Sequence, residues 1–253
     1  MHDDMKKTVI ITGGTKGIGA DIARAFYKEG MNIFIAARHD NGLAQKLGER
    51  ARFVRMDVRR ENDHLRAAAA ALKETGRLDI YVNCAGFSGW KPLMEVKEKF
   101  WDDMIGTNLK GTFWGCKAAA KYLSPGGVIV NISSLAGKRG SANNSVYCAS
   151  KFGVTGLTQA LAKELGPKGI RVVAVCPVYV ETPGVLKALK DQRSPAHGKN
   201  VQAYLKKFTV EQAALRKLPT GENIAQACLF LASAAAEAIT GQSLNVDCGV
   251  LPQ

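Results

Sequence analysis

The 253-residue sequence predicts an α/β protein built as a doubly wound parallel sheet with helices on both faces. Short β-branched apolar runs alternate with longer segments of helical periodicity, as expected of strand–helix–strand units. The strands are apolar throughout instead of alternating with polar residues, which is typical of a sheet that is covered on both faces. No linker, repeat or low-complexity tract divides the chain, so we expect a single domain over residues 1–253.

Each predicted element rests on a local pattern. The run T-V-I-I-T at residues 8–12 is typical of a buried strand. The helix predicted at residues 17–28 stops at Glu29-Gly30, a common helix end. Apolar spacing predicts the remaining elements. These are strands at residues 32–37, 53–58, 78–83, 127–133, 170–176 and 243–246, and helices at residues 63–74, 101–123, 146–165 and 221–232.

Residues 184–218 interrupt this alternation and carry only weak, broken helical signals. They contain eight lysines and arginines against two acids, a net charge of +6 in a chain whose total is +13. Long insertions in compact domains are usually functional lids or mobile loops. Ligands of doubly wound sheets bind beyond the carboxyl ends of the strands, where this segment begins. We therefore expect residues 184–218 to form a basic lid.

Composition excludes several classes of protein. With 46% hydrophobic and 23% charged residues, the chain is neither disordered nor collagen-like nor a coiled coil. No apolar run approaches the ~18–20 residues that cross a bilayer, and the start M-H-D-D-M-K-K leaves no room for a signal peptide. We expect a cytoplasmic protein without a membrane partner. The charge of +13 is consistent with solubility and non-specific attraction to anions, or with a specific partner that is either nucleic acid or a small acidic ligand.

Cysteine and histidine spacing gives no indication of a metal site. The six cysteines form no C-x-x-C pair, and the four histidines form no pair with ligand spacing. We expect reduced thiols, most of them buried as small apolar side chains, and no bound metal.

The first candidate functional motif is T-G-G-T-K-G-I-G at residues 12–19, between the first strand and its helix. Glycines at 13, 17 and 19 would let the backbone approach a pyrophosphate closely, and the helix N-terminus presents free N–H groups to it. The motif lacks the G-K-[ST] ending of a P-loop. Alternatively, the motif is a glycine-rich turn that only opens a helix. This motif alone therefore does not establish a pyrophosphate site.

The end of the second strand predicts which dinucleotide would bind. It reads Ala36-Ala37-Arg38-His39, without the acid that usually holds the ribose of NAD. Arg38, with Lys16 nearby, could instead pair with a 2′-phosphate. This favours NADP(H) as the cofactor. NAD(H) stays open, and Arg38 and Lys16 could alternatively be two solvated surface cations. Asp57, predicted to end the third strand, could contact the adenine amine or simply cap the strand.

The second candidate motif is Y-C-A-S-K at residues 147–151, in which Tyr147 and Lys151 share a helix face. A phenol near pKa ~10 exchanges protons poorly at neutral pH, and an adjacent ammonium would lower that pKa. Such a pair is also common on helix surfaces. However, the fifth strand delivers Ser133 and Ser134 to the carboxyl edge of the sheet, where a hydroxyl could donate to a substrate carbonyl oxygen.

Across essentially its full length, the sequence resembles the short-chain dehydrogenase/reductase family. The matching pieces are T-G-G-T-K-G-I-G (12–19), N-C-A-G (83–86), Asn108, S-S (133–134), Y-C-A-S-K (147–151), P-V-Y-V-E-T-P (177–183) and T-G-Q-S-L-N-V-D-C-G (240–249). The resemblance implies a Rossmann-like fold and hydride transfer with a nicotinamide cofactor. It also implies a homotetramer, since the family commonly assembles through its long helices and last strand.

The resemblance also implies residue roles. Tyr147 would exchange the proton, Ser134 more than Ser133 would orient the substrate oxygen, and Lys151 would bind the nicotinamide ribose and lower the pKa of Tyr147. Asn108 would hold a water in a proton relay, with a helix-bending role as the alternative. The cofactor contacts expected are Gly13, Thr15, Lys16, Gly17, Ile18, Gly19, Arg38, Asp57, Val58, Asn83, Ala85, Gly86, Tyr147, Lys151, Pro177, Val180 and Thr182.

The sequence departs from the family pattern at three positions. Cys84 and Val173 each replace an asparagine, and Val178 replaces a glycine that comes after the sixth strand. Val178 disfavours a positive φ and adds bulk near the nicotinamide site. This puts the local loop geometry in doubt, although it leaves the Ser134, Tyr147 and Lys151 positions untouched.

The predicted function is NADP(H)-dependent hydride transfer to or from a small-molecule secondary alcohol or ketone. The basic lid suggests that the substrate can be anionic, of 3-oxoacyl, sugar or cyclic ketone type, and a solvated basic surface is the alternative. An NAD-dependent dehydrogenase of the same family, or a cofactor-binding module without catalysis, remains open. No nucleic-acid-binding motif supports a nucleic-acid partner. Candidate pocket residues are Phe87, Ser88, Trp90, Ala136, Arg139, Asn143, Tyr179 and parts of the lid.

Overall fold

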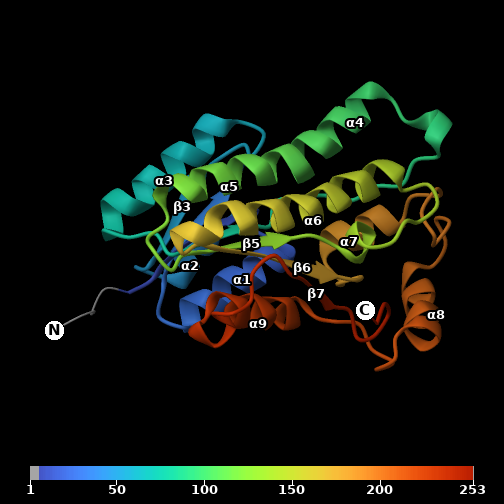
Figure 1. The fold of residues 1–253 in the computed structure, drawn as a ribbon. Helices are drawn as coiled ribbons and strands as arrows, with labels where there is room; N and C mark the ends of the chain where they lie inside the picture. The colour runs from blue at the N-terminus through green and yellow to red at the C-terminus, as the bar shows by residue number, and fades with distance from the viewer. Residues whose placement is uncertain (1–5, 253) are drawn as a thin grey trace.

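The computed structural model describes residues 6–252 and contains one parallel sheet of seven strands in the order β3-β2-β1-β4-β5-β6-β7 (Figure 1). This confirms the predicted doubly wound, Rossmann-like fold. The strands are β1 (Thr8–Thr12), β2 (Asn32–Ala37), β3 (Ala51–Arg55), β4 (Ile80–Asn83), β5 (Val128–Ile132), β6 (Arg171–Pro177) and β7 (Ser243–Val246).

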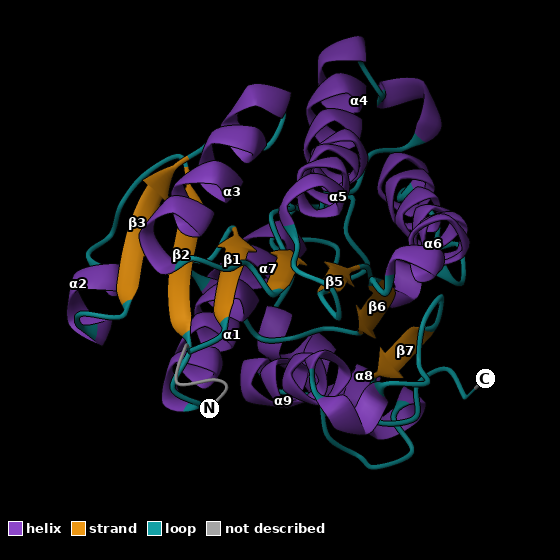
Figure 2. Ribbon diagram, turned by 60° about the vertical axis from the view of Figure 1, so that its left-hand side comes forward, coloured by secondary structure: helices purple, strands orange, loops and turns teal. Residues whose placement is uncertain are grey.

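Helices cover both faces of the sheet, as Figures 1 and 2 show. On one face lie α1 (Gly17–Lys28), α2 (Leu43–Leu47) and α9 (Gly221–Ala232); on the other lie α3 (Glu61–Thr75), α4 (Glu98–Ile105), α5 (Gly111–Tyr122) and α6 (Ser145–Leu165). Two helices of the lid, α7 (Pro183–Leu189) and α8 (Val201–Gln212), complete the set.

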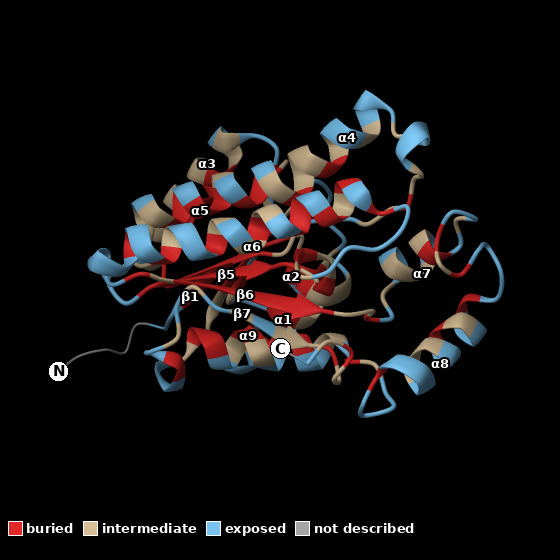
Figure 3. Cartoon of the chain, turned by 45° about the vertical axis from the view of Figure 1, so that its right-hand side comes forward, coloured by how far each residue is buried: buried red, intermediate tan, exposed pale blue. Residues whose placement is uncertain are grey.

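The strands are apolar throughout because each of their faces meets a separate core. Along β1, Val9 and Ile11 pack on the side of α1 and α9, while Ile10 packs on the side of α3 and α5. All three side chains are fully buried (Figure 3). Deleting such a side chain to alanine typically costs ~2–5 kcal/mol, so both layers of helices contribute to holding the sheet.

The strand order reverses between β1 and β4, which is where ligands of such sheets bind. Thr12, the last residue of β1, is in register with Ala36 of β2 and Asn83 of β4. The segments after these three strands therefore leave the sheet side by side at its carboxyl edge.

A chain of buried polar side chains crosses the centre of the molecule. Asn83 and Asn131 are register partners on β4 and β5, and the Asn83 amide donates to the Asn131 side-chain oxygen at 2.9 Å. The Asn131 amide in turn donates to the Thr158 hydroxyl of α6 at 3.0 Å. Asn131 and Thr158 have no exposed surface. These hydrogen bonds satisfy both amide N–H₂ groups and the Asn131 side-chain oxygen, whereas the Asn83 side-chain oxygen is buried without a partner among the described residues.

The structure corrects the third predicted strand, which ends at Arg55 and not at residue 58. The Asp57 backbone N–H donates to the Asp63 carboxylate at 2.9 Å instead of to a neighbouring strand. The Asp57 carboxylate accepts from the Arg59 backbone N–H at 3.1 Å, which closes a turn. Side-chain capping therefore ends the strand earlier than its apolar pattern indicates.

The long helix predicted at residues 101–123 is also different. It starts earlier, at Glu98, and a π-helical segment, η2 (Gly106–Lys110), separates α4 from α5. Such segments often occur at functional sites, and this one contains Asn108. Two glycines of α5 face inward. A Cβ on Gly111 would lie 2.9 Å from Val58, and one on Gly115 would lie 1.9 Å from Asn83.

The lid forms two helices with a small apolar core of its own. Thr182 and Asn200 cap α7 and α8 by accepting from Val185 N–H and Ala203 N–H. The buried members of this core are Trp90, Leu189, Ala196, Val201 and Leu205. All eight lid cations are exposed to solvent.

Several expectations about composition can be compared with the described residues. All six cysteines are unpaired thiols, as predicted. No described helix has the length and apolarity to span a membrane. Within residues 6–252 there is no cluster of histidine, cysteine and acidic side chains that could hold a metal ion. Most of the start M-H-D-D-M-K-K, on which the signal-peptide expectation rests, lies outside the described residues.

Candidate functional site

The glycine motif forms a tight connection between β1 and α1. Gly13 has a φ of 68°, and a Cβ there would lie 2.8 Å from the Cα of Ala85. A Cβ on Gly19 would lie 2.4 Å from the Gly13 carbonyl oxygen. Lys16, the residue that precedes α1, makes no side-chain cap to the helix. The first turn of α1 therefore presents uncapped N–H groups, an arrangement that suits a phosphate.

The loops after β1 and β4 are joined by Thr12. Its hydroxyl accepts from the backbone N–H groups of Cys84 and Ala85 at 3.0 and 3.2 Å. Thr12 was not predicted as a site residue, although its place at the end of β1 is the signal that could have found it. A hydroxyl at the end of one strand thus holds the loop of the next strand in place.

Arg38 and Lys16 are both exposed, as a contact with a 2′-phosphate requires. The positive charge of Arg38 contributes to lowering the pKa of Asp57 and of Asp103, so Arg38 lies near both carboxylates. Asp57 itself is held by Arg59, whose Nη2 lies 2.7 Å from a carboxylate oxygen. The Asp57 side chain is therefore already paired at the position where a contact with adenine was expected.

The catalytic candidates Ser134, Tyr147 and Lys151 come together at the carboxyl end of β5. Lys151 is buried in α6, and its Nζ donates to the Ile132 carbonyl oxygen at 2.8 Å. The same Nζ lies 5.8 Å from the centroid of the Tyr147 ring. Ser134 lies near the Tyr147 phenol and contributes to lowering its pKa. Because the Ser134 oxygen also accepts from Ala136 N–H at 3.1 Å, its own hydrogen is available to donate.

Burial dominates the protonation of this group. It raises the pKa of Tyr147, and Ser134 opposes that rise. It also lowers the pKa of Lys151 to about 8. The pKa of Tyr147 is therefore raised in this structure, whereas the sequence led us to expect that Lys151 would lower it. Tyr147 is a neutral phenol at neutral pH and so carries a proton that it can donate.

Asn108 holds the loop after β4 from within the π-helical segment. Its side-chain oxygen accepts from Phe87 N–H at 3.0 Å, and its amide donates to the Phe87 carbonyl at 2.9 Å. The amide also lies 3.2 Å from the Ser150 hydroxyl, which donates to the Tyr147 carbonyl. Asn108 thus connects the loop to the helix that carries Tyr147. Its water-holding role stays a prediction.

Contacts and burial place four more of the predicted residues. Gly86 belongs to the cluster, since a Cβ there would lie 3.1 Å from the Asn108 side-chain oxygen. Asn83, Val58 and Ser133 are buried and turned inward, so their side chains do not line the edge of the sheet. Ser133 donates to the Lys151 carbonyl at 3.1 Å. Ser150 was not predicted, and its position within Y-C-A-S-K is the only sequence signal for it.

The segment after β6 faces the glycine motif. A Cβ on Gly17 would lie 3.2 Å from the Thr182 methyl group, so Thr182 lies beside Gly17 and the helix start that it opens. Pro177 and Val180 are buried beneath this segment. Val178 is not among the described non-glycine residues with positive φ, and it packs with Leu135 and Val250. The loop therefore accommodates valine without left-handed backbone.

Taken together, an uncapped helix start after the glycine motif, a Ser–Tyr–Lys group and a doubly wound sheet are typical of a class of nucleotide-dependent oxidoreductases. A family model described as enoyl-(acyl carrier protein) reductase matches residues 13–251. The chain belongs to the short-chain dehydrogenase/reductase family.

Proteins similar to this chain include ketoreductases, and they do not identify the substrate of this chain. The chain is 36% identical over 256 residues to the 3-oxoacyl-[acyl-carrier-protein] reductase FabG of Chlamydia muridarum, covering 97% of this chain and 98% of the relative. It resembles an actinorhodin polyketide ketoreductase variant with NADPH (34% identity, TM-score 0.90, 99% of each chain). It also resembles the 3-ketoacyl-(acyl-carrier-protein) reductase of Brucella melitensis complexed with NADH (32% identity, TM-score 0.85, 96% and 98% of the chains).

Proposed function

We propose that the chain is a single NADP(H)-dependent oxidoreductase domain over residues 1–253 that interconverts a secondary alcohol and a ketone. The observation that carries this proposal is the meeting of Ser134, Tyr147 and Lys151 at the edge of the sheet, beside the uncapped start of α1. An intact proton-exchange group beside a phosphate-binding helix start favours catalysis over a cofactor-binding module without activity.

The residues at the edge of the sheet fit a nicotinamide dinucleotide. Gly13 and Gly19 allow the tight turn that leads into α1, and the α1 N–H groups would bind a pyrophosphate. Lys151 would hold the hydroxyls of the nicotinamide ribose, and Thr182 would lie at the carboxamide end. When bound, the nicotinamide supplies or accepts the hydride.

The protein itself would manage the proton. Ser134 donates a hydrogen bond to the ketone oxygen and orients it toward Tyr147. Tyr147 then donates its phenolic proton to that oxygen as the alcohol forms. The Lys151 ammonium stabilises the phenolate that is left, because opposite charges a few ångströms apart attract strongly in a buried site.

NADP(H) is preferred over NAD(H) in this proposal because of the side chains near the end of β2. Arg38 and Lys16 are exposed cations. The end of β2 also lacks the acidic residue that would repel a 2′-phosphate. The relatives do not decide between the cofactors, since one structure contains NADPH and the other NADH. An NAD-dependent enzyme of the same family is therefore the second candidate.

Cofactor titration and then a ketone panel test the proposal. We expect NADPH to bind more tightly than NADH, and Arg38→Ala to remove most of that difference. Tyr147→Phe should reduce turnover by a factor of at least ~100, the usual contribution of a general acid, while cofactor affinity stays unchanged. Equal turnover of Tyr147→Phe and wild type would instead support the cofactor-binding module.

The substrate proposed is a small ketone or alcohol, including anionic ones of 3-oxoacyl, sugar or cyclic ketone type. The exposed cations of the lid support an anionic substrate, as do relatives named as acyl-carrier-protein reductases. Reversing Lys206 and Lys207 to glutamate should lower kcat/KM for an anionic ketone and weaken its salt dependence. An unchanged kcat/KM and salt dependence would leave the lid as a solvated surface.

We further propose a cytoplasmic homotetramer that has no nucleic-acid or membrane partner. Exposed apolar side chains on two pairs of elements support the assembly. Phe113 and Phe152 lie on the outer faces of α5 and α6, and Phe230 and Leu244 lie on α9 and β7. Two such pairs suit the two kinds of interface that a tetramer with two-fold symmetry requires.

A further inference from the structure

An aromatic cluster joins the segment after β6 to the lid, and the proton transfer through Ser134, Tyr147 and Lys151 does not use it. The Tyr179 and Tyr204 hydroxyls lie 3.2 Å apart. The Tyr179 ring packs edge-on against Phe208, with ring centroids 4.9 Å apart. Tyr204 and Phe208 both come from α8, whereas Tyr179 lies two residues beyond β6.

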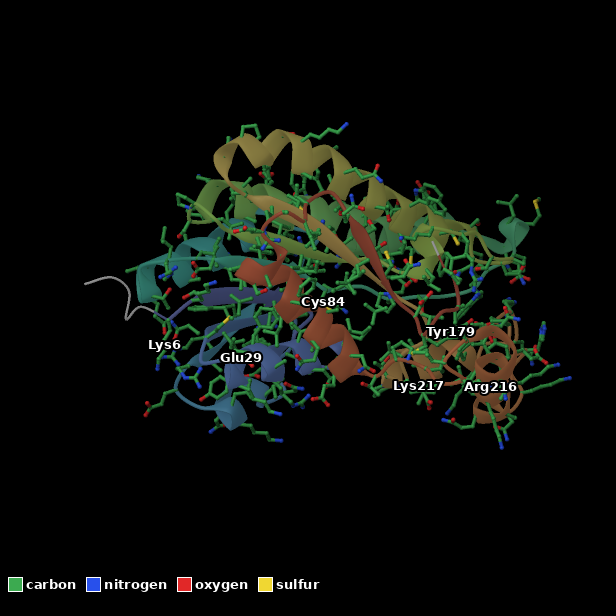
Figure 4. The ribbon with its side chains drawn as sticks, turned by 60° about the horizontal axis from the view of Figure 1, so that its bottom comes forward. Lys6, Glu29, Cys84, Tyr179, Arg216 and Lys217 are labelled. Carbon is green, nitrogen blue, oxygen red and sulfur yellow. The ribbon has the colours of Figure 1, made fainter. Side chains whose placement is uncertain are left out.

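Tyr179 lies at the same edge of the sheet as the catalytic group. It comes after β6, which pairs in parallel with the strand that delivers Ser134. The charges of Tyr147 and Arg139 both influence the pKa of Tyr179, which places the phenol near the catalytic tyrosine and near a cation. Its neighbour Val178 packs with Leu135 and Val250 on another side, while Tyr179 packs against the lid core. Figure 4 labels Tyr179 beside the lid.

Hydrogen-bond counting shows that this pair is incomplete. Two hydroxyl groups have two protons between them, and the bond between the two oxygens uses only one. Among the described residues, neither hydroxyl has a second hydrogen-bond partner. One O–H donor therefore remains available, held in place by two half-buried rings and by Phe208. A donor held in this way can recognise an oxygen atom.

We propose that Tyr179 and Tyr204 form a subsite that binds a second oxygen atom of the substrate, apart from the carbonyl that is reduced. The subsite selects ketones that also carry an acceptor such as an ester or thioester carbonyl. Phe208 supports the ring of Tyr179, and Arg139 favours acceptors that carry partial negative charge. This inference rests on the proposed function, since it adds a specificity element to the same site.

The test compares two ketones of similar size that differ in the second acceptor. Ethyl acetoacetate has an ester carbonyl, and 2-heptanone does not. For Tyr179→Phe we expect kcat/KM to fall about tenfold with ethyl acetoacetate and to change less than twofold with 2-heptanone, because only the first ketone loses a hydrogen bond. Tyr204→Phe should give a similar selective loss, and the double variant should lose little more than either single variant.

Tyr122→Phe, at the end of α5, is the matched control and should behave like wild type with both ketones. Equal losses with the two ketones in Tyr179→Phe would assign the pair to lid packing and overturn the subsite. No loss with either ketone would also overturn it. Quenching of tryptophan fluorescence by each ketone gives a binding readout that needs no turnover. Selective weakening of ethyl acetoacetate binding in an inactive protein would support the subsite and reject only the proposed function.

Discussion

At the scale of single residues, the proposed chemistry depends on how burial sets the charge of Lys151. Its Nζ has one backbone acceptor, the Ile132 carbonyl, and lies close to the Tyr147 ring. Burial brings the pKa of Lys151 down to about 8 while it raises that of Tyr147. Above pH 8 the site of the free enzyme therefore loses the ammonium before it loses the phenolic proton.

This order of titration predicts the pH dependence of ketone reduction. We expect kcat/KM to be constant below about pH 8 and to fall up to tenfold per pH unit above it, because the deprotonated Lys151 no longer stabilises the developing phenolate. Initial rates between pH 6 and 10 measure this profile. Lys151→Arg keeps its charge throughout that range, so its residual activity should show no fall. A wild-type profile that stays flat to pH 10 would contradict the assignment.

Residue identities at the site were predictable where the chemistry is local. Tyr147 and Lys151 are one helical turn apart, and Ser134 lies just beyond a strand. By contrast, the contacts of Asn108 and Ser150 join segments that are distant in sequence, so no spacing rule predicts them. The pairing of Asp57 with Arg59 was not predicted either, and the adenine contact suggested for Asp57 stays a prediction.

At the scale of elements, α3 is held to the sheet by a buried histidine. His64 has no exposed surface. Its Nε2 lies 2.9 Å from the Val58 carbonyl, and its Nδ1 lies 2.8 Å from the Tyr81 hydroxyl of β4. A carbonyl can only accept, so this geometry assigns the proton to Nε2, and Tyr81 then donates to Nδ1. Burial lowers the pKa of His64, which keeps the ring neutral.

This neutral histidine predicts how stability depends on pH. Below pH ~6.5 an unfolded chain binds a proton at His64 that the folded chain does not, so the free energy of unfolding falls with pH by at most ~1.4 kcal/mol per unit from this group. The free energy of unfolding continues to fall until the pH reaches the lowered pKa of His64 in the folded chain. Above pH ~6.5 the ring is neutral in both states, and the stabilisation from His64 is fully present. Urea unfolding at pH 7.5 and 5.5 measures it.

His64→Gln removes the titration and should reduce this pH dependence, although the variant starts from lower stability. The exposed His39 gives the matched control, because His39→Gln should keep the wild-type dependence. If the free energy of unfolding fell equally from pH 7.5 to pH 5.5 in wild type and in His64→Gln, this would count against a buried neutral His64.

Element boundaries were predictable where pattern and capping agree. The bounds of β1, α1 and β2 match their predicted ranges. The end of β3 and the π-helical segment depend on side-chain hydrogen bonds to other segments, and apolar periodicity carries no information about these. The two lid helices gave weak signals because their stability comes from a separate core around Trp90 and Leu189.

At the scale of the whole molecule, the outer surface carries large apolar side chains that the single chain does not cover. Phe113 and Phe152 are 42% and 46% exposed, and Phe230 and Leu244 are 45% and 41% exposed. Isolated apolar side chains are common on protein surfaces, but pairs on neighbouring elements are typical of interfaces. This supports the proposed tetramer.

The two pairs predict stepwise dissociation. Phe152→Glu should leave dimers in light scattering, because a buried carboxylate disrupts one interface and leaves the other. Combining it with Leu244→Glu should give monomers. Met94→Glu, at a position 92% exposed in η1 (Leu93–Glu95), is the control and should remain tetrameric. A monomeric wild-type protein would contradict the assembly.

The buried polar chain through Asn83, Asn131 and Thr158 has a consequence for how the chain folds. If β4 paired with β5 one residue out of step, one asparagine would turn to the opposite face and its amide would lose its partner. Each buried group left unpaired costs ~1–3 kcal/mol, so misaligned pairings are disfavoured. The correct alignment sets the level at which the Cys84–Gly86 loop and Ser134 leave the sheet. The hydrogen bonds of Asn83, Asn131 and Thr158 thereby help to set the geometry of the candidate site.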